Sequence, residues 1–137
     1  MRTFRWIMGF VVASTMAFTA MAPAAQAVEV DLHARLNGST AFTRATGFSE
    51  YGRSAEGREV EVTVRNIGGL AGQNVVVYVA GTKVGAIRVS SAGVAHREWD
   101  TERGQSVPFA SAGDFIKVRT TGGTLVATGK YVREAGD

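Results

Sequence analysis

Two histidines with acidic neighbours are the residues of this sequence whose types and spacing come closest to a site for chemistry. His96, Glu98 and Asp100 stand at i, i+2 and i+4, so in a β-strand their side chains share one face, about 6–7 Å apart. His33 lies two residues from Asp31 in a second alternating stretch. Imidazole and carboxylate groups are zinc ligands, and carboxylates also bind calcium. If the two strands are neighbours, four side chains would form a metal site: His33, His96, Glu98 and Asp100. The alternative is that they are solvated groups on the outer face of a sheet.

No stretch of the sequence has the spacing of a catalytic or nucleotide-binding motif. The serines lie mostly in expected turns and loops, and none stands in a Gly-x-Ser-x-Gly elbow. The glycine-rich residues 66–74 lack the Gly-Lys-Ser/Thr ending of a phosphate loop. Strand acids such as Glu59 and Glu61 are explained by pairing with cations across a sheet. The sequence therefore predicts a protein that is not an enzyme and has no cofactor.

The first 27 residues have the layout of a secretory signal peptide. Arg2 and Arg5 precede an uncharged, mostly apolar stretch over residues 6–21, and a small-x-small site ends at Ala27. We expect cleavage after Ala27 and a secreted or periplasmic protein. The chain has no cysteine, which excludes a lipoprotein anchor. An Ala-rich leader and an Arg-heavy composition are typical of a bacterial exported protein.

Charge limits the partners that this protein would bind. The leader holds two of the 15 basic residues and none of the 12 acidic ones, so the remainder carries 13 and 12, a net charge of +1. Such a balance gives no field that would attract nucleic acid. No apolar run after the leader is long enough to span a bilayer, so we expect no stable membrane insertion after cleavage. The expected partner is an unknown protein or glycan of the cell envelope.

Strict alternation of apolar and polar residues predicts a single all-β domain over residues 28–137. Val60, Val62 and Val64 share one face of their stretch, while charged residues occupy the other. Eight strands are expected, at residues 28–36, 40–51, 59–65, 75–79, 84–89, 94–100, 115–120 and 124–132. Their number and spacing favour an antiparallel, immunoglobulin-like β-sandwich of about seven or eight strands, with a small closed β-barrel as the alternative.

Individual residues add detail to this expected fold. Gly47, inside the second strand, indicates a bulge or a close approach of another backbone. Trp99 is expected to fill the core, and Arg97, on the same face, to lie at a strand end where its guanidinium reaches water. Tyr78 and Val76 would form an apolar patch for a sugar ring or a protein if exposed, but a face covered by a loop or a second sheet is the plainer expectation.

The order Val77-x-Val79-x-Gly81-x-x-Val84-Gly85 is followed by four further turn and strand residues or pairs. These are Asp100-Thr101, Gly104, Val107-Pro108 and Gly113. Over residues 58–131 the pattern resembles small exported bacterial β-sandwich proteins of unassigned function. The resemblance implies a fold and transfers no functional residue, because its motifs are strand valines and turn glycines.

The expected signal peptide, the single β domain and the absence of catalytic motifs together lead to one prediction. The protein is expected to be an exported, non-catalytic binding or structural module of the bacterial cell envelope or extracellular space. The alternative is a metal- or glycan-binding domain that uses the polar strand face around His33 and His96. A third reading, a subunit of a surface assembly, depends on residues 28–36 and 124–132 being open edge strands.

Overall fold

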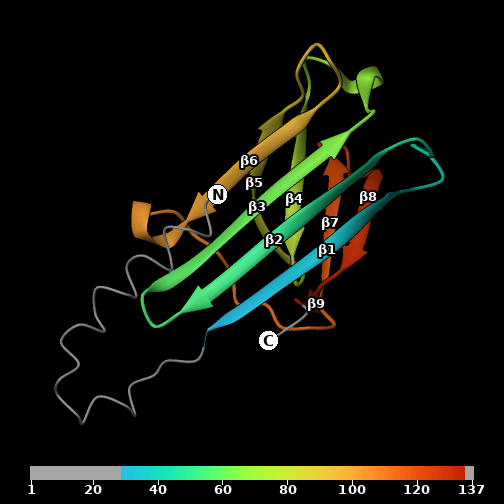
Figure 1. Ribbon diagram of the computed structural model, residues 1–137. Coiled ribbons are helices and arrows are strands. Elements are labelled where there is room, and N and C mark those ends of the chain that lie inside the picture. Colours follow the sequence, from blue (N-terminus) through green and yellow to red (C-terminus); the bar gives the residue numbers. More distant parts are fainter. Residues whose placement is uncertain (1–28, 135–137) are drawn as a thin grey trace, which may run out of the picture.

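The structure, a computed structural model, describes residues 29–134 and is all-β in this range (Figure 1). The expected signal peptide, residues 1–27, lies outside the described residues. The strands are β1 Val30–Gly38, β2 Thr46–Ser54, β3 Gly57–Arg65, β4 Asn74–Val79, β5 Thr82–Arg88, β6 Ala95–Asp100, β7 Phe115–Thr120, β8 Leu125–Lys130 and β9 Val132–Arg133. Short 3-10 helices lie at Gly68–Leu70 and Thr101–Arg103. Within residues 29–134 no helix has the length and apolar character needed to cross a membrane.

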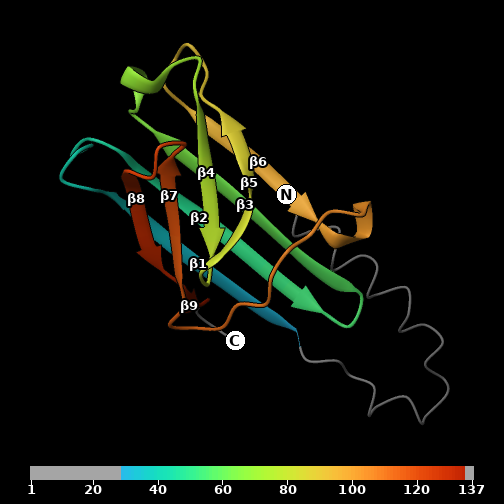
Figure 2. The same ribbon diagram turned by 180° about the vertical axis from the view of Figure 1, so that it is seen from behind.

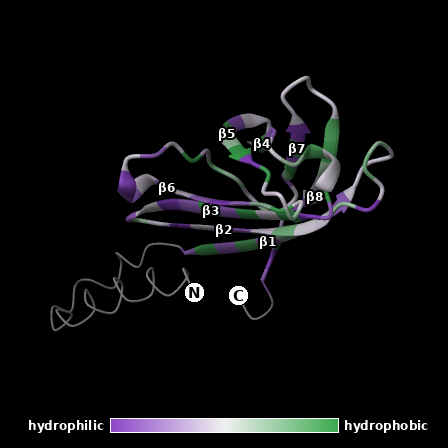
Figure 3. Cartoon of the chain, turned by 90° about the horizontal axis from the view of Figure 1, so that it is seen from above, coloured by the Kyte–Doolittle hydropathy of each residue, from purple (hydrophilic) through white to green (hydrophobic). Residues whose placement is uncertain are grey.

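All these strands belong to one antiparallel sheet. Its order is β5-β4-β7-β8-β1-β2-β3-β6, and β9 pairs with β1 beside β8. Seen from above, β1, β2, β3 and β6 form one layer, and β4, β5, β7 and β8 form the other (Figure 3). The two end strands, β5 and β6, contact each other. The sheet is therefore barrel-shaped and nearly closed.

The predicted immunoglobulin-like sandwich is corrected by this topology, and the small-barrel alternative lies closer to the structure. A sandwich consists of two separate sheets, whereas here β1 continues from one layer into the other. Asn37 and Gly38 at its end pair with Thr128 and Ala127 of β8. An added Cβ at Gly129 would collide with the Arg35 carbonyl oxygen. Glycine at this position thus allows β8 to approach β1.

Alternation determines which side chains enter the core, as the sequence predicted. The four apolar side chains of β1 are buried, and so are Val60, Val62 and Val64 of β3, while the residues between the β1 ones are exposed or half-buried. Trp99 is 3% exposed and belongs to the core, which confirms its expected place. Val76 is buried as well and Tyr78 is half-buried, so an exposed Tyr78–Val76 patch does not form.

The second strand begins later than its composition predicted. Residues 39–45 form turns, in which Phe42 N donates to Ser39 O and Ala45 N donates to Phe42 O, and β2 starts at Thr46. The close backbone approach expected at Gly47 is confirmed, because an added Cβ there would collide with the carbonyl oxygen of Thr63. β-propensity alone could not separate this turn from the strand, because threonine and phenylalanine suit both a strand and a packed turn.

Candidate binding surface

The outer face of β1, β2, β3 and β6 carries the polar side chains that the sequence singled out. The register places His33 opposite Glu50, Glu50 opposite Glu61, and Glu61 opposite Glu98. Side chains directly opposite on antiparallel strands lie about 4.5–5.5 Å apart at their Cβ atoms. One row across the sheet thus runs from a histidine over three carboxylates.

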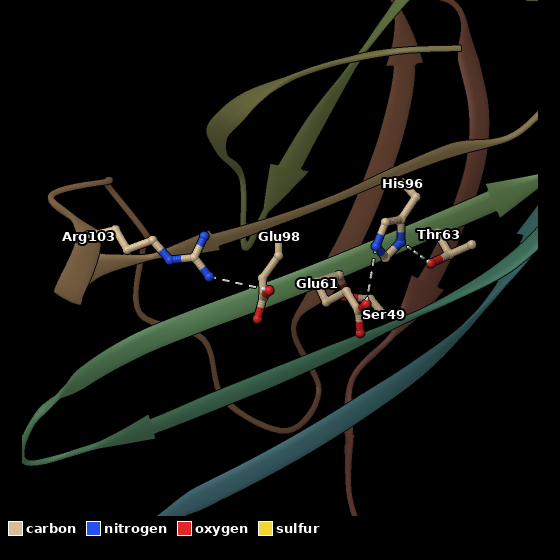
Figure 4. A network of polar contacts seen from close by, with 6 residues as sticks. All are labelled: Ser49, Glu61, Thr63, His96, Glu98 and Arg103. Atoms are coloured by element: carbon tan, nitrogen blue, oxygen red, sulfur yellow. Dashed lines mark hydrogen bonds and ion pairs between the residues drawn. The ribbon is translucent and has the colours of Figure 1, made fainter. Parts of the chain in front are cut away.

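His33 and His96 lie in different parts of this face. β2 and β3 separate their strands, so the condition for a joint metal site is not met. His96 instead contacts β3: its Nδ1 lies 2.9 Å from Thr63 Oγ1, and its Nε2 lies 3.5 Å from Glu61 Oε2 (Figure 4).

The two predicted acidic ligands have other partners. Glu98 Oε1 lies 3.5 Å from Arg103 Nη2. Asp100 is buried, and its Oδ1 accepts a hydrogen bond of 2.8 Å from Glu102 N at the start of a 3-10 helix. Among residues 29–134 no group of three or more histidines and acids could hold a metal ion. The structure therefore brings His96 to Glu61 and gives Glu98 and Asp100 local structural roles.

A shallow hollow of about 930 Å³ lies on the other half of the same face. Its lining includes three cationic side chains, Arg35, Arg65 and Lys130. Two large apolar side chains, Phe48 and Val132, are 43% and 44% exposed within it. The remaining lining residues are His33, Ala34, Thr46, Gly47, Glu50 and Glu134.

Buried neighbours fix the outward direction of both apolar side chains. Ser49, next to Phe48, points inward, and its Oγ lies 2.7 Å from the hydroxyl of the buried Tyr131. Because successive side chains of a strand alternate, Phe48 must face outward. Val132 follows Tyr131 and pairs with His33, so it lies outward at the side of the hollow.

The hollow combines positive charge with apolar surface. Arg35 stands directly opposite Phe48 in the β1–β2 register, and Arg65 stands opposite Thr46. The Lys130 ammonium lies 5.7 Å from the centre of the Phe115 ring. Guanidinium groups bind carboxylate and phosphate bidentately, and an aromatic ring offers a flat apolar contact. This surface suits an anionic ligand that also has an apolar face.

Sequence reasoning placed His33 on this face but missed Phe48, Arg35 and Arg65. A signal for Phe48 was present: in β2 it alternates with Ser49 and Tyr51, so its outward direction followed from placing Tyr51 inside. What the sequence lacked was the position of β9, whose Val132 lies beside His33.

Comparison of the sequence with models of known protein families finds no match. Comparison with curated proteins finds none either.

Proposed function

We propose that the protein is an exported, non-catalytic binding module of the bacterial cell envelope or extracellular space. Its ligand is an acidic glycan, held in the hollow on the outer face of β1, β2 and β3. Export is supported by the charged start, the apolar stretch and the small-x-small site within residues 1–27.

The observation that carries this proposal is the exposure of Phe48 and Val132 in a concave surface with three cations. Phe48 lies outside the core cluster, because the core lies on the opposite side of the strand, and the exposed part of its ring is available for contact with a ligand. The interior is filled by close-packed side chains of β1, β3, β4 and β7, so a ligand would bind on the outside.

The chemistry of the lining favours a sugar acid. The apolar face of a sugar ring stacks on an aromatic side chain, here Phe48. A carboxylate, sulfate or phosphate on the same sugar would pair with Arg35 or Arg65. Glu50 and Glu134, which also line the hollow, would accept hydrogen bonds from sugar hydroxyls, since ionised carboxylates only accept.

Isothermal titration calorimetry of residues 28–137 tests the proposal. The ligands are acidic oligosaccharides, each with its neutral counterpart and with a poly-glutamate peptide of similar length. We expect binding of at least one acidic glycan and weaker binding of its neutral form. Phe48→Ala should weaken that binding about tenfold, which corresponds to the loss of about 1.4 kcal/mol.

Arg65→Gln and Arg88→Gln form a matched pair of charge variants. Both arginines are exposed at the end of a strand, but Arg88 belongs to β5 in the other layer. Only the Arg65 variant should lose affinity. Equal effects of the two, or binding that ignores Phe48→Ala, contradict a site in the hollow. Preference for the peptide would show that the partner is a protein.

A further inference from the structure

A loop at one end of the molecule holds an exposed phenylalanine in place. The connection between β6 and β7 passes below the end of β4 and reaches the start of β7 (Figure 2). The hydroxyl of Tyr51 in β2 holds this connection: it donates to Pro108 O at 2.7 Å and accepts from Ala110 N at 3.0 Å. Val107 and Ala110 are buried, while Phe109 between them is 66% exposed. Its ring is therefore kept at the surface by anchors on both sides.

Two arginines lie against this ring. The guanidinium carbon of Arg58 is 4.2 Å from the ring centre of Phe109, and that of Arg53 is 5.8 Å from it. Arg58 Nε donates to Val107 O at 2.6 Å, and Arg53 Nε donates to Ala110 O at 3.3 Å. Each guanidinium is thus oriented through its Nε atom. Within residues 29–134 the terminal amino groups of both make no hydrogen bond.

Two positive charges lie close together beside this loop. Arg53 and Arg58 stand directly opposite each other in the β2–β3 register, and like charges in that position repel. Neither forms an ion pair with a carboxylate of the part of the chain that the structure describes. Two carboxylates of the adjoining segments accept hydrogen bonds from neutral groups: Glu56 Oε1 accepts from Ser54 Oγ at 3.0 Å, and Asp114 Oδ2 accepts from Ser111 N at 2.9 Å.

We propose that Arg53, Arg58 and Phe109 form an anion-binding site for a carboxylate or phosphate group. Two oriented guanidinium groups with available amino donors are the arrangement that binds such oxyanions bidentately. An anion between them removes their mutual repulsion, and Phe109 shields the contact from water on one side. This site lies at the β2–β3 turn end of the molecule, is separate from the hollow around Phe48, and does not depend on the proposed function.

Titration of residues 28–137 followed by NMR tests this site, at constant ionic strength. The probes are inorganic phosphate, a uronic-acid trisaccharide and a glycerol-phosphate oligomer, which separate a free ion from the two polymer sources. We expect saturable shifts of the Nε–H signals of Arg53 and Arg58, and of the backbone amide of Phe109. The Arg88 Nε–H signal serves as the internal control and should stay in place.

Variants separate binding from loop anchoring. Arg53→Gln should weaken binding of the preferred probe about tenfold, since it removes one charge-assisted contact. Arg53→Lys keeps the charge but loses the planar fork, and should give an intermediate affinity. Arg88→Gln should leave affinity unchanged, and melting temperatures show whether each variant stays folded.

Linear shifts without saturation, or equal shifts at Arg88, overturn the proposal. Loss of glycan binding in the Phe48→Ala variant with this site intact would show that the two sites are independent.

Discussion

Tyr131 carries a phenol hydroxyl into the centre of an apolar core. The side chain is fully buried, and its ring lies 5.8 Å from the ring of Tyr51. Its hydroxyl is 2.7 Å from Ser49 Oγ, which itself donates to Glu61 O at 2.8 Å. Because the serine proton is used in the second bond, Tyr131 is the donor in the first. This chain of bonds joins β2, β3 and the segment before β9.

Removing either partner should destabilise the fold. Ser49→Ala leaves the tyrosine hydroxyl buried without an acceptor, which costs about 1–3 kcal/mol of unfolding free energy. Tyr131→Phe removes the donor and should cost about 1 kcal/mol. The double variant should lose less than the sum of the two, since no orphan hydroxyl remains. Urea unfolding of the four proteins measures this coupling, and additive losses would contradict the assigned bond.

Tyr131 also predicts a loss of stability at high pH. Burial, the largest cause, raises the pKa of Tyr131 well above its ordinary value of 10, against the lowering effect of the Ser49 hydrogen bond. Above pH 10 the unfolded chain therefore releases the phenol proton while the folded chain keeps it. The free energy of unfolding then falls by about 1.4 kcal/mol per pH unit from this group. Below pH 10 the phenol is protonated in both the folded and the unfolded chain, so the full stabilisation from Tyr131 is present.

Comparing wild type with Tyr131→Phe between pH 9 and 11 checks this prediction. The variant starts from its own stability at pH 9 and should lose less with rising pH, since it lacks one titrating group. Burial also raises the pKa of Tyr51, but that residue is present in both proteins and cancels in the comparison. Parallel curves would show that Tyr131 ionises equally in the folded and unfolded chains.

At the scale of elements, β5 and β6 meet as the two ends of the sheet. Arg97 Nη1 donates to Ala86 O across this seam at 2.9 Å, and the Arg97 guanidinium carbon lies 5.0 Å from the centre of the Trp99 ring. Gly85 provides the space for Trp99, since an added Cβ would lie 2.8 Å from its Nε1. Arg97 is exposed, as expected, but it lies inside β6 and not at the strand end that the sequence predicted. Side chains rather than a continuous backbone ladder thus hold these two strands together.

Gly85→Ala should therefore disturb the seam. Overpacking against a buried ring costs about 1–3 kcal/mol, and Trp99, the only tryptophan after residue 27, should report it by a shift of its fluorescence emission. Gly69→Ala is the matched control, because an added Cβ there meets nothing within 4 Å. It should change stability by less than about 0.5 kcal/mol. Equal stability of the two variants would mean that Trp99 has room to move.

Strand positions followed from the sequence, whereas strand neighbours did not. Alternation is a local property, so it predicted β1, β3 and the inward side of each. Pairing of β3 with β6 joins segments with β4 and β5 between them, and no local pattern encodes it. The lack of information on strand neighbours also explains why the sequence predicted a joint metal site for His33 and His96. His33 was correctly placed on an outer face, but its distance from His96 depends on the two strands that lie between them.

At the scale of the whole molecule, the sheet is not fully closed, because no ladder of backbone hydrogen bonds joins its two end strands, β5 and β6. In the sheet order, β5 pairs only with β4 and β6 only with β3, while the other long strands have a partner on both sides over at least part of their length. Backbone amides on the edges of β5 and β6 that face each other should therefore be the ones that exchange with solvent most readily. The sequence predicted edge strands at residues 28–36 and 124–132, but β1 and β8 are both internal. This removes the structural basis for self-assembly through those two strands.

Hydrogen exchange measured by NMR tests this picture of the molecule. Seam-facing amides of β5 and β6 should exchange through local openings of low free energy, while amides of β1, β3 and β4 should exchange only with global unfolding. Arg97→Ala should speed exchange in β5 and leave β1 unchanged, because the bond to Ala86 O is lost. Protection of the seam equal to that of β1 would show that backbone bonds close the sheet in solution. In that case Arg97 would contribute little to closure, and the loss of stability in Gly85→Ala would come from Trp99 packing alone.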